Sequence, residues 1–378
     1  MKFTDLQSSY DASRRLINSR IQTVLDHGHY VMGPEVAELE HRLASYTGAR
    51  HCITVSSGTT ALAIALMAVG IGPGYDVITS PLAGIATTEA ILLTGARPVF
   101  IDIERATCTL DPGLIEPAIT PATRAIIPVS LYGQPSDMDA INGVAARHGL
   151  AVIENGAQSL GATYHGRQSG NLALIGCISF FPSHPLGCYG DGGALLTNDD
   201  ALAMTMRDIR MHGRARRHAR VHVRLGPGAR MDTLQCAIVL ARLERFDWEI
   251  RQRRLVAAAY DDMLKPHVPL IGGRPDRTSV HAQYTVLVED RERVRTILEQ
   301  AGIPTAVHYP VPLHRQPAYI DLTGGASCPV TDAMAASVLS LPIGSYMAAT
   351  AVRHVAQRLL DATRPRQLRG VETVELPG

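Results

Sequence analysis

A histidine stands in the most chemically suggestive segment of the chain, SFFPSHPLGCYGDGG at residues 179–193. His184 is followed there by a glycine-rich turn and then by an apolar run typical of a buried strand. Because histidine titrates near neutral pH, it suits proton abstraction next to a carbonyl group. We therefore expect His184 to act as a general acid or base. The alternative is a packed, hydrogen-bonded histidine with a structural role.

Two further segments carry polar groups where a ligand could bind. Glu154, at the end of the run LAVIEN, is a second candidate acid/base group, and capping of the next helix is its alternative role. The segment VSSGTTALA reads as a strand that enters a helix, and free N–H groups at such a helix start suit a phosphate. A plain helix cap has the same sequence. The candidate phosphate-binding residues are Ser57, Gly58, Thr59 and Thr60.

A mostly parallel sheet is predicted to position these segments. Short β-branched runs, such as HCITV, RPVFI, RAII and LAVI, alternate with helix-like runs of 10 to 15 residues over the first two thirds of the chain. This alternation is typical of βαβ units. Ligands of such sheets bind beyond the carboxyl ends of the strands. From about Met231 the pattern changes to one long helical stretch, bent near residues 246–248, and then to a smaller α+β part.

The composition argues against several classes of function. The chain has 378 residues, a net charge of +1 and 19% charged residues, which favours no nucleic-acid partner. We expect a cytoplasmic protein that binds no membrane, because no apolar run has the length of a membrane span and MKFTDLQSSY lacks the apolar core of a signal peptide. The six cysteines are scattered without a C-x-x-C pair, so we expect buried thiols and no metal site.

The order of the motifs resembles the DegT/DnrJ/StrS family of sugar aminotransferases, and most of all its branch that acts on UDP-linked 3-keto uronic acid sugars. The matching motifs are SSGTTALAIALMAVGIGPG, SPLAGIATTEAI, AVIENGAQSLGATYHGRQSG, SFFPSHPLGCYGDGGALLTND, RMDTLQCAIVLARLE and VHYPVPLHRQPAY. The resemblance implies the α/β fold of type I pyridoxal-phosphate (PLP) transferases, with a smaller C-terminal α+β domain. It also implies a homodimer with active sites at the subunit interface. We place a large domain at residues 1–246, with an N-terminal helical arm at 1–30, and a small domain at 247–378.

The residue that bonds covalently to PLP in this family is replaced. Relatives have a lysine at the position of His184, and an imidazole cannot form the Schiff base that PLP chemistry uses. The sequence contains two lysines, Lys2 and Lys265, and neither lies in a family motif.

Three further PLP contacts of the family also differ. Relatives pair the pyridine nitrogen with an aspartate, and this chain has the neutral Asn155 there. Gly84 stands where relatives have a stacking aromatic ring. Gly228 stands where relatives have an asparagine that reaches the cofactor phosphate across the dimer.

Other positions keep the family pattern, namely Ser179 and Gln158 beside the cofactor and a set on the substrate side: Arg210, His212, His308, Tyr309 and His314. Because the cofactor side is altered and the substrate side is kept, we expect the former PLP pocket to bind another ligand. The expected function is a PLP-independent lyase or isomerase without a cofactor. It would carry out an isomerisation, elimination, cyclisation or condensation on a small polar metabolite such as a nucleotide sugar, with His184 as the acid/base group.

Three alternatives remain open. The first is a pyridoxamine-phosphate-dependent keto-sugar dehydratase. The family includes such an enzyme, a GDP-4-keto-6-deoxymannose 3-dehydratase, in which a histidine replaces the lysine and the cofactor is held without a covalent bond. The second is a non-catalytic partner of a true aminotransferase. The third is an inactive Lys→His variant of a sugar aminotransferase.

Overall fold

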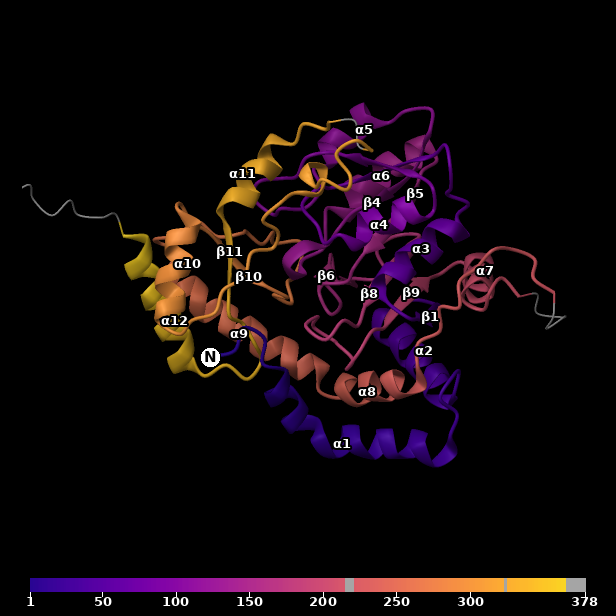
Figure 1. Ribbon diagram of the computed structural model, residues 1–378, viewed down its shortest axis with the longest axis horizontal. Coiled ribbons are helices and arrows are strands. Elements are labelled where there is room, and N and C mark those ends of the chain that lie inside the picture. The colour runs from indigo at the N-terminus through magenta and orange to yellow at the C-terminus, as the bar shows by residue number, and fades with distance from the viewer. Residues whose placement is uncertain (215–220, 323–324, 365–378) are drawn as a thin grey trace, which may run out of the picture.

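A seven-stranded sheet forms the centre of the molecule (Figure 1). The computed structural model describes residues 1–214, 221–322 and 325–364. The strand order is β1-β9-β8-β5-β4-β2-β3; β9 runs antiparallel to β1 and β8, and the pairs from β8 to β3 are parallel. The predicted α/β fold with a mostly parallel sheet is therefore confirmed. The strands are β1 (His51–Val55), β2 (Asp76–Thr79), β3 (Arg97–Phe100), β4 (Thr123–Ile127), β5 (Ala151–Asn155), β8 (Ile175–Ser179) and β9 (Gly193–Thr197).

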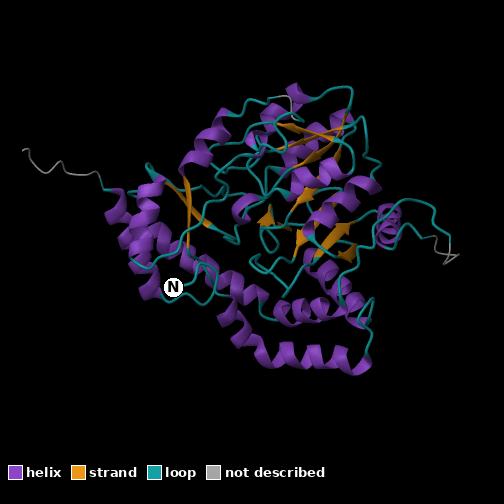
Figure 2. Ribbon diagram, in the orientation of Figure 1, coloured by secondary structure: helices purple, strands orange, loops and turns teal. Residues whose placement is uncertain are grey.

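Helices cover both faces of this sheet (Figure 2). They are α2 (Pro34–Thr47), α3 (Gly58–Ala68), α4 (Ala86–Leu93), α5 (Ile115–Ala118), α6 (Met138–His148), α7 (Asp200–Arg210) and α8 (Thr233–Leu243). Short elements complete this part of the chain: the hairpin β6 (Thr163–Tyr164) and β7 (Arg167–Gln168), and the 3₁₀ turns η1 (Pro112–Leu114) and η2 (Leu131–Gly133).

Each strand contributes to two hydrophobic layers, because successive side chains of a strand point to opposite faces. In β2, Val77 packs into the layer that contains α3, and its neighbour Ile78 packs into the layer that contains α6. Leu195 and Leu196 of β9 divide in the same way. This burial on both faces explains why the strands read as continuous apolar runs rather than as alternating ones.

The long helical stretch expected after Met231 is two helices, α8 and α9 (Phe246–Leu264), which are separated at residues 244–245. The break lies next to the bend expected at residues 246–248. The N-terminal helix α1 (Leu6–His27) lies along α8 (Figure 1), where Ile17 packs against Ile238 and Ala241. This helix falls within the expected N-terminal arm at residues 1–30, and it is docked on the large part of the molecule.

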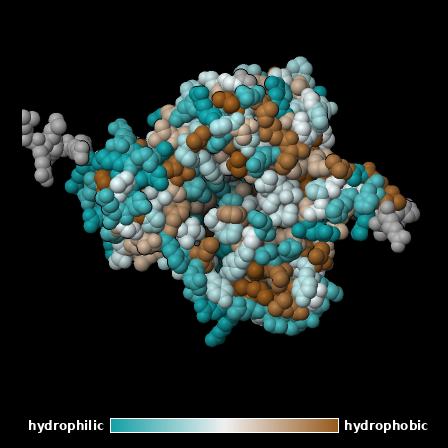
Figure 3. Space-filling model, viewed as in Figure 1, coloured by the Kyte–Doolittle hydropathy of each residue, from teal (hydrophilic) through white to brown (hydrophobic). Residues whose placement is uncertain are grey.

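A smaller lobe with its own core follows. We call it the small lobe: the second half of α9, β10 (Tyr284–Leu287), α10 (Arg291–Gln300), α11 (Pro329–Ser337), β11 (Val338–Leu341) and α12 (Ala349–Thr363). The turn η3 (Leu313–Arg315) lies between α10 and α11. Hydrophilic residues predominate over α10 and α12 (Figure 3). Because Phe246 of α9 packs in the large core and Tyr260 in the small one, the boundary at residues 246/247 stays a prediction. Residues 365–378 of the predicted small domain lie outside the described residues.

All six cysteines are buried and unpaired, as the sequence predicts. Nowhere in the described part of the chain does a helix combine the length and the apolar content that a membrane span requires.

Candidate active site

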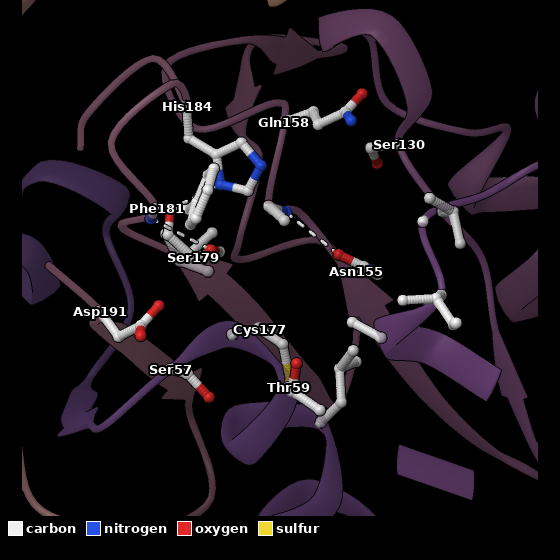
Figure 4. Close-up of a pocket in the computed structure, with 18 of the residues that line it drawn as sticks. Ser57, Thr59, Ser130, Asn155, Gln158, Cys177, Ser179, Phe181, His184 and Asp191 are labelled. Carbon is white, nitrogen blue, oxygen red and sulfur yellow. Dashed lines mark hydrogen bonds between the residues drawn. The ribbon is translucent and has the colours of Figure 1, made fainter. Parts of the chain in front are cut away.

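A cavity of about 360 Å³ opens at the carboxyl ends of the parallel strands. We call it the active-site cavity (Figure 4). The segments that follow β1, β2, β4, β5 and β8 all contribute to it, as expected for an open α/β sheet. The cavity is lined by Ser57, Gly58, Thr59, Leu62, Gly84, Ile85, Ala86, Val129, Ser130, Asn155, Ala157, Gln158, Cys177, Ile178, Ser179, Phe181, His184, Asp191 and Tyr309.

One end of the cavity is the N-terminus of α3. The Ser57 hydroxyl caps this helix, because its Oγ accepts a hydrogen bond from the Thr60 N–H at 3.1 Å. Within the described residues, the N–H groups of Gly58 and Thr59 donate to no protein acceptor. Free N–H groups at a helix start attract anions, so this end suits a phosphate. The predicted cap and the predicted phosphate cradle are therefore compatible, and Thr60 belongs to the cap rather than to the cavity lining.

A close approach of two backbone segments shapes this phosphate end. A Cβ atom on Gly58 would lie 2.6 Å from the Cβ atom of Ser179, at the end of β8. Glycine is therefore required for α3 to begin so close to that strand. The same approach brings Ser179, a predicted cofactor contact, to the cavity beside the N–H groups of α3.

His184 lies half-buried on the side of the cavity that Ser179 and Phe181 form, with its ring edge-on to Phe181 at a centroid distance of 5.8 Å (Figure 4). Its Nδ1 lies 3.3 Å from the backbone oxygen of Ser179. An N–H donated to that oxygen leaves the lone pair on Nε2. Burial lowers the pKa of His184 from 6.5 to about 4, against the opposing effect of the Ser179 carbonyl. At neutral pH the imidazole is therefore a free base.

Asn155 is held in one orientation at the end of β5. Its Oδ1 accepts a hydrogen bond from the Ala157 N–H at 3.2 Å, and its Nδ2 donates to Thr87 Oγ1 at 2.9 Å. Rotating the amide by half a turn would place the Nδ2 group of Asn155 against the Ala157 N–H, so that two donors would face each other. The side chain therefore offers the cavity a hydrogen-bond acceptor without a negative charge.

Tyr309 occupies the space beside Gly84. A Cβ atom on Gly84 would lie 3.1 Å from the Tyr309 hydroxyl. Gln158 Nε2 donates to that hydroxyl at 3.4 Å, and Gln158 Oε1 accepts from the Tyr132 N–H at 2.9 Å. The cavity therefore keeps an aromatic side chain next to Gly84, but this ring comes from a distant part of the sequence.

The structure does not bring Glu154 to the cavity, and its predicted acid/base role is wrong. The carboxylate is fully buried and accepts hydrogen bonds from Ser169 Oγ at 2.6 Å and from the N–H groups of Gly170 at 2.9 Å and Leu172 at 3.2 Å. Neighbouring strand residues point to opposite faces, so Asn155 faces the cavity and Glu154 cannot. Glu154 instead anchors the loop at residues 169–172.

Two residues predicted on the substrate side are held elsewhere. Arg210 is 4% exposed, and its Nη1 donates to Glu40 Oε1 at 2.5 Å and to the Thr54 backbone oxygen at 3.0 Å. His314 is 1% exposed, and its Nε2 lies 3.2 Å from Asp332 Oδ1. Both side chains are buried and neither lines the active-site cavity, so their predicted contact with substrate stays a prediction.

Three more predicted residues lie outside the cavity lining. A Cβ atom on Gly228 would lie 2.7 Å from the ring of His212, so these two residues pack against each other. His308 Nδ1 lies 2.9 Å from Ser340 Oγ of β11. Of the predicted substrate-side residues, only Tyr309 lines the cavity in the described chain.

Sequence reasoning missed several lining residues, among them Ser130, Cys177, Phe181 and Asp191. Ser130 follows β4, and the rule that ligands bind beyond strand ends could have found it. Phe181 and Asp191 lie in the segment around His184, so their position in that segment was a usable signal. Cys177 gave no such signal, because it lies inside β8.

This donor set fits a phosphorylated pyridine cofactor that is held without a covalent bond. The start of α3 fits the phosphate, and Asn155 offers an acceptor. No lysine lines the cavity: Lys2 lies 3.8 Å from Asp5 near the N-terminus, and Lys265 directly follows α9. A covalent Schiff base to this chain is therefore not available.

Comparisons with known proteins show the family to which the chain is similar. The chain matches the model of the DegT/DnrJ/EryC1/StrS aminotransferase family over residues 12–360. It is 50% identical over 364 residues to the UDP-2-acetamido-2-deoxy-3-oxo-D-glucuronate aminotransferase of Pseudomonas aeruginosa, which covers 96% of this chain and 100% of that protein.

Two solved structures are similar over most of the chain. One is a DegT/DnrJ/EryC1/StrS aminotransferase from Brucella abortus, with a TM-score of 0.94, 35% identity and coverage of 96% of this chain and 99% of that chain. The other is NtdA from Bacillus subtilis with bound cofactor PMP, with a TM-score of 0.88, 32% identity and coverage of 93% and 82%. The resemblance to sugar aminotransferases and the type I PLP-transferase fold are therefore confirmed.

These matches contradict the expected PLP-independent lyase or isomerase. A relative that is 50% identical over nearly the full length is a sugar aminotransferase, which points to PLP-dependent transamination rather than to its loss. The expectation that no cofactor binds is likewise unsupported. The replaced residues remove the covalent bond to the cofactor, but they do not remove the other groups that could hold it. The phosphate cradle and the acceptor at residue 155 survive, and non-covalent binding needs no lysine.

Proposed function

We propose that this chain, which belongs to the DegT/DnrJ/EryC1/StrS aminotransferase family, is an enzyme that transaminates a nucleotide-linked keto sugar with a non-covalently held cofactor. The observation that carries the proposal is the active-site cavity itself. It keeps a phosphate cradle at the start of α3, but the residue at the lysine position is a neutral histidine.

The cofactor in this proposal is pyridoxamine phosphate or PLP. When bound, it carries the amino group and supplies the electron sink for the reaction. The N–H groups of Gly58 and Thr59 and the hydroxyl of Ser179 would hold its phosphate. Asn155 would accept a hydrogen bond at the ring, and Tyr309 would cover the ring on the side of Gly84.

His184 is the proposed proton carrier. Its Nδ1–H is donated to the Ser179 carbonyl, so the proton would be gained and lost at Nε2. Because its pKa is lowered to about 4 by burial, the imidazole is unprotonated at neutral pH and ready to accept a proton. A phosphate nearby would raise this pKa toward the neutral range, since an anion favours the charged imidazolium.

The proposed substrate class comes from the Pseudomonas relative, which is named for a UDP-linked 3-oxo-glucuronate. We therefore infer a UDP-linked 3-keto uronic acid sugar as the substrate. The cavity of about 360 Å³ would hold the cofactor and the reacting end of the sugar, and the nucleotide would lie toward its open mouth.

A homodimer is part of the proposal. Leu93 and Leu225 are 76% and 84% exposed. They flank an apolar groove of about 410 Å³ that also contains Thr59 and Thr60. This groove adjoins the phosphate end of the active-site cavity, because Thr59 lines both. A second copy of the chain would cover these leucines and close the phosphate end.

The test is a single-turnover reaction of the purified protein with pyridoxamine phosphate and UDP-2-acetamido-2-deoxy-3-oxo-D-glucuronate. Mass spectrometry should detect the corresponding amino sugar. The substitution His184→Ala should slow this turnover by about 10²- to 10⁴-fold, the usual contribution of a general base. The exposed His267 supplies a matched control, His267→Ala, which should leave the rate unchanged. Tight binding of both compounds without an amino-sugar product would contradict the proposal.

A keto-sugar dehydratase is the second candidate. The observation that favours it is the histidine at the lysine position together with a cavity that no lysine lines. The same reaction separates the two candidates, because a dehydratase of this kind would release ammonia and a deoxy keto sugar that has one oxygen atom fewer than the substrate, while pyridoxamine phosphate is oxidised to PLP, and it would release no amino sugar.

A further inference from the structure

A buried tyrosine outside the active-site cavity contacts the segment that carries Tyr309. Tyr132 lies in the turn η2, is 4% exposed and does not line the active-site cavity. Its ring packs in a hydrophobic cluster with Met334 of α11 and Val338 of β11, and Tyr309 packs against the same cluster. The proposed transamination gives Tyr132 no role of its own.

Two hydrogen bonds join Tyr132 to the Tyr309 side of the cavity. The Tyr132 N–H donates to Gln158 Oε1 at 2.9 Å, and the Tyr132 hydroxyl donates to the backbone oxygen of His308. Gln158 Nε2 in turn donates to the Tyr309 hydroxyl at 3.4 Å. Because His308 directly precedes Tyr309 in the chain, Tyr132 holds Tyr309 at two points. One is the backbone, through His308, and the other is the hydroxyl, through Gln158.

The backbone of Tyr132 has an uncommon conformation. Its φ is 59°, which lies in the left-handed region that a residue with a Cβ atom rarely adopts. Such a conformation persists where the surrounding contacts hold it, and it is frequent at functional sites. Burial raises the pKa of the Tyr132 hydroxyl well above its usual range, so this hydroxyl remains a donor at neutral pH. Both polar groups of Tyr132 are therefore committed to the residues at the cavity wall.

We propose that Tyr132 is a positioning residue that holds the Tyr309 ring at the active-site cavity, and through Tyr309 the ring of the bound cofactor. Tyr309 is the aromatic side chain beside Gly84, where a Cβ atom would lie 3.1 Å from the Tyr309 hydroxyl. A displacement of Tyr309 would therefore change the space that the cofactor ring can occupy. The effect on the cofactor rests on the proposed function, whereas the placement of Tyr309 by Tyr132 does not.

The first test needs no cofactor. Tyr132→Phe removes the hydroxyl but keeps the aromatic ring and the N–H that donates to Gln158. In the full chain labelled with fluorotyrosine, the fluorine NMR signal of Tyr309 is identified by its absence from Tyr309→Phe. We expect this signal to shift and to narrow in Tyr132→Phe, because Tyr309 loses the anchor at the His308 backbone oxygen and becomes more mobile.

Tyr260→Phe is the matched control for the loss of a buried hydroxyl. Tyr260 is fully buried in the small lobe, and its hydroxyl also donates to a backbone oxygen, that of Pro342, at 2.9 Å. It does not line the active-site cavity, and it packs in a different hydrophobic cluster from Tyr309. We therefore expect Tyr260→Phe to leave the Tyr309 signal unchanged.

The second test measures the cofactor. Titration calorimetry should show that pyridoxamine phosphate binds about threefold to tenfold more weakly to Tyr132→Phe, the scale of one hydrogen bond. The near-ultraviolet circular dichroism of the bound cofactor should change as well, whereas Tyr260→Phe should match the unchanged chain in both measurements. Because Tyr132 acts through Tyr309, the substitution Tyr132→Phe should cause no further loss of affinity in a chain that already carries Tyr309→Ala.

Three results would overturn the proposal. The first is an unmoved Tyr309 signal in folded Tyr132→Phe, and the second is an unchanged affinity of that variant for pyridoxamine phosphate. The third is a loss of affinity that is equally large with and without the Tyr309 side chain. If the unchanged chain binds no pyridoxamine phosphate, the proposed function fails instead. The Tyr309 signal then decides by itself whether Tyr132 positions this residue.

Discussion

Two parts of the active-site cavity differ in how far they retain the groups that a PLP site needs. At the phosphate end, Ser57, Gly58 and Ser179 form a cradle whose close packing tolerates no side chain at residue 58. Two neutral groups, His184 and Asn155, line the rest of the cavity at positions where the resemblance implies a lysine and an aspartate. Under the proposed function, the residues that bind the cofactor phosphate are therefore different from the residues that act in the chemistry.

Covalent capture is the largest change that a single substitution should cause. The variant His184→Lys places an amine where the cofactor would react, so we expect PLP to survive gel filtration and to be trapped on the chain by borohydride. Peptide mass spectrometry should find the adduct at residue 184. The unchanged chain should lose PLP on the same column, because neither Lys2 nor Lys265 lines the cavity. A folded variant without an adduct would show that residue 184 does not face the cofactor.

The phosphate end should be the more sensitive to size. In Gly58→Ala the new methyl group would lie 2.6 Å from the Cβ atom of Ser179, so the start of α3 must move. We expect a loss of about 1 to 3 kcal/mol in the free energy of unfolding, as for other overpacked sites. We also expect weaker binding of pyridoxamine phosphate by titration calorimetry. Gly143→Ala in α6 is the control, because a Cβ atom there meets no atom within 4 Å. If both variants bind pyridoxamine phosphate with equal affinity, α3 does not contact the cofactor.

Introducing a negative charge at residue 155 should have a smaller effect on cofactor binding. In Asn155→Asp the carboxylate can still accept from the Ala157 N–H, and the Thr87 hydroxyl can donate in place of accepting. A negative charge there favours a protonated pyridine, so we expect about tenfold tighter binding of pyridoxamine phosphate. Titration calorimetry and the absorbance spectrum of the bound cofactor measure this. The exposed Asn18 provides the control, Asn18→Asp. Unchanged affinity would show that the ring does not approach residue 155.

The sequence predicted the sheet well because the relevant information is local. Runs such as LAVI carry the apolar pattern of a buried strand, and the order of the elements then restricts the topology. The site residues at or just beyond strand ends were found for the same reason, among them Ser57 after β1 and the last residues of β5 and β8, Asn155 and Ser179.

The remaining site residues depend on contacts that no local pattern encodes. Arg210 looked like part of a substrate loop, but it pairs with Glu40, which is far away in the sequence. Glu154 was predicted to line the site, but it lies one residue before Asn155 in β5. Neighbouring residues of a strand point to opposite faces, so Glu154 points away from the cavity. The replacement of several cofactor contacts suggested the loss of the cofactor, but the sequence did not reveal that Tyr309 lies beside Gly84.

The smallest expected effect is the contribution of His184 to the change of stability with pH. The pKa of His184 is about 4 in the folded protein, below its usual value of 6.5, so the unfolded chain binds a proton more readily between these two values. The contribution of His184 to stability is therefore lost as the pH falls from 6.5 to 4. We expect this loss to be about 1 kcal/mol, reduced because the side chain is half-buried. Urea denaturation at pH 7 and pH 5 measures it. His281 shares the lowered pKa, so the difference between the unchanged chain and His184→Ala isolates the share of His184. If stability falls equally in both proteins, His184 is as well hydrated in the cavity as in the unfolded chain. The cavity around His184 would then be open to water.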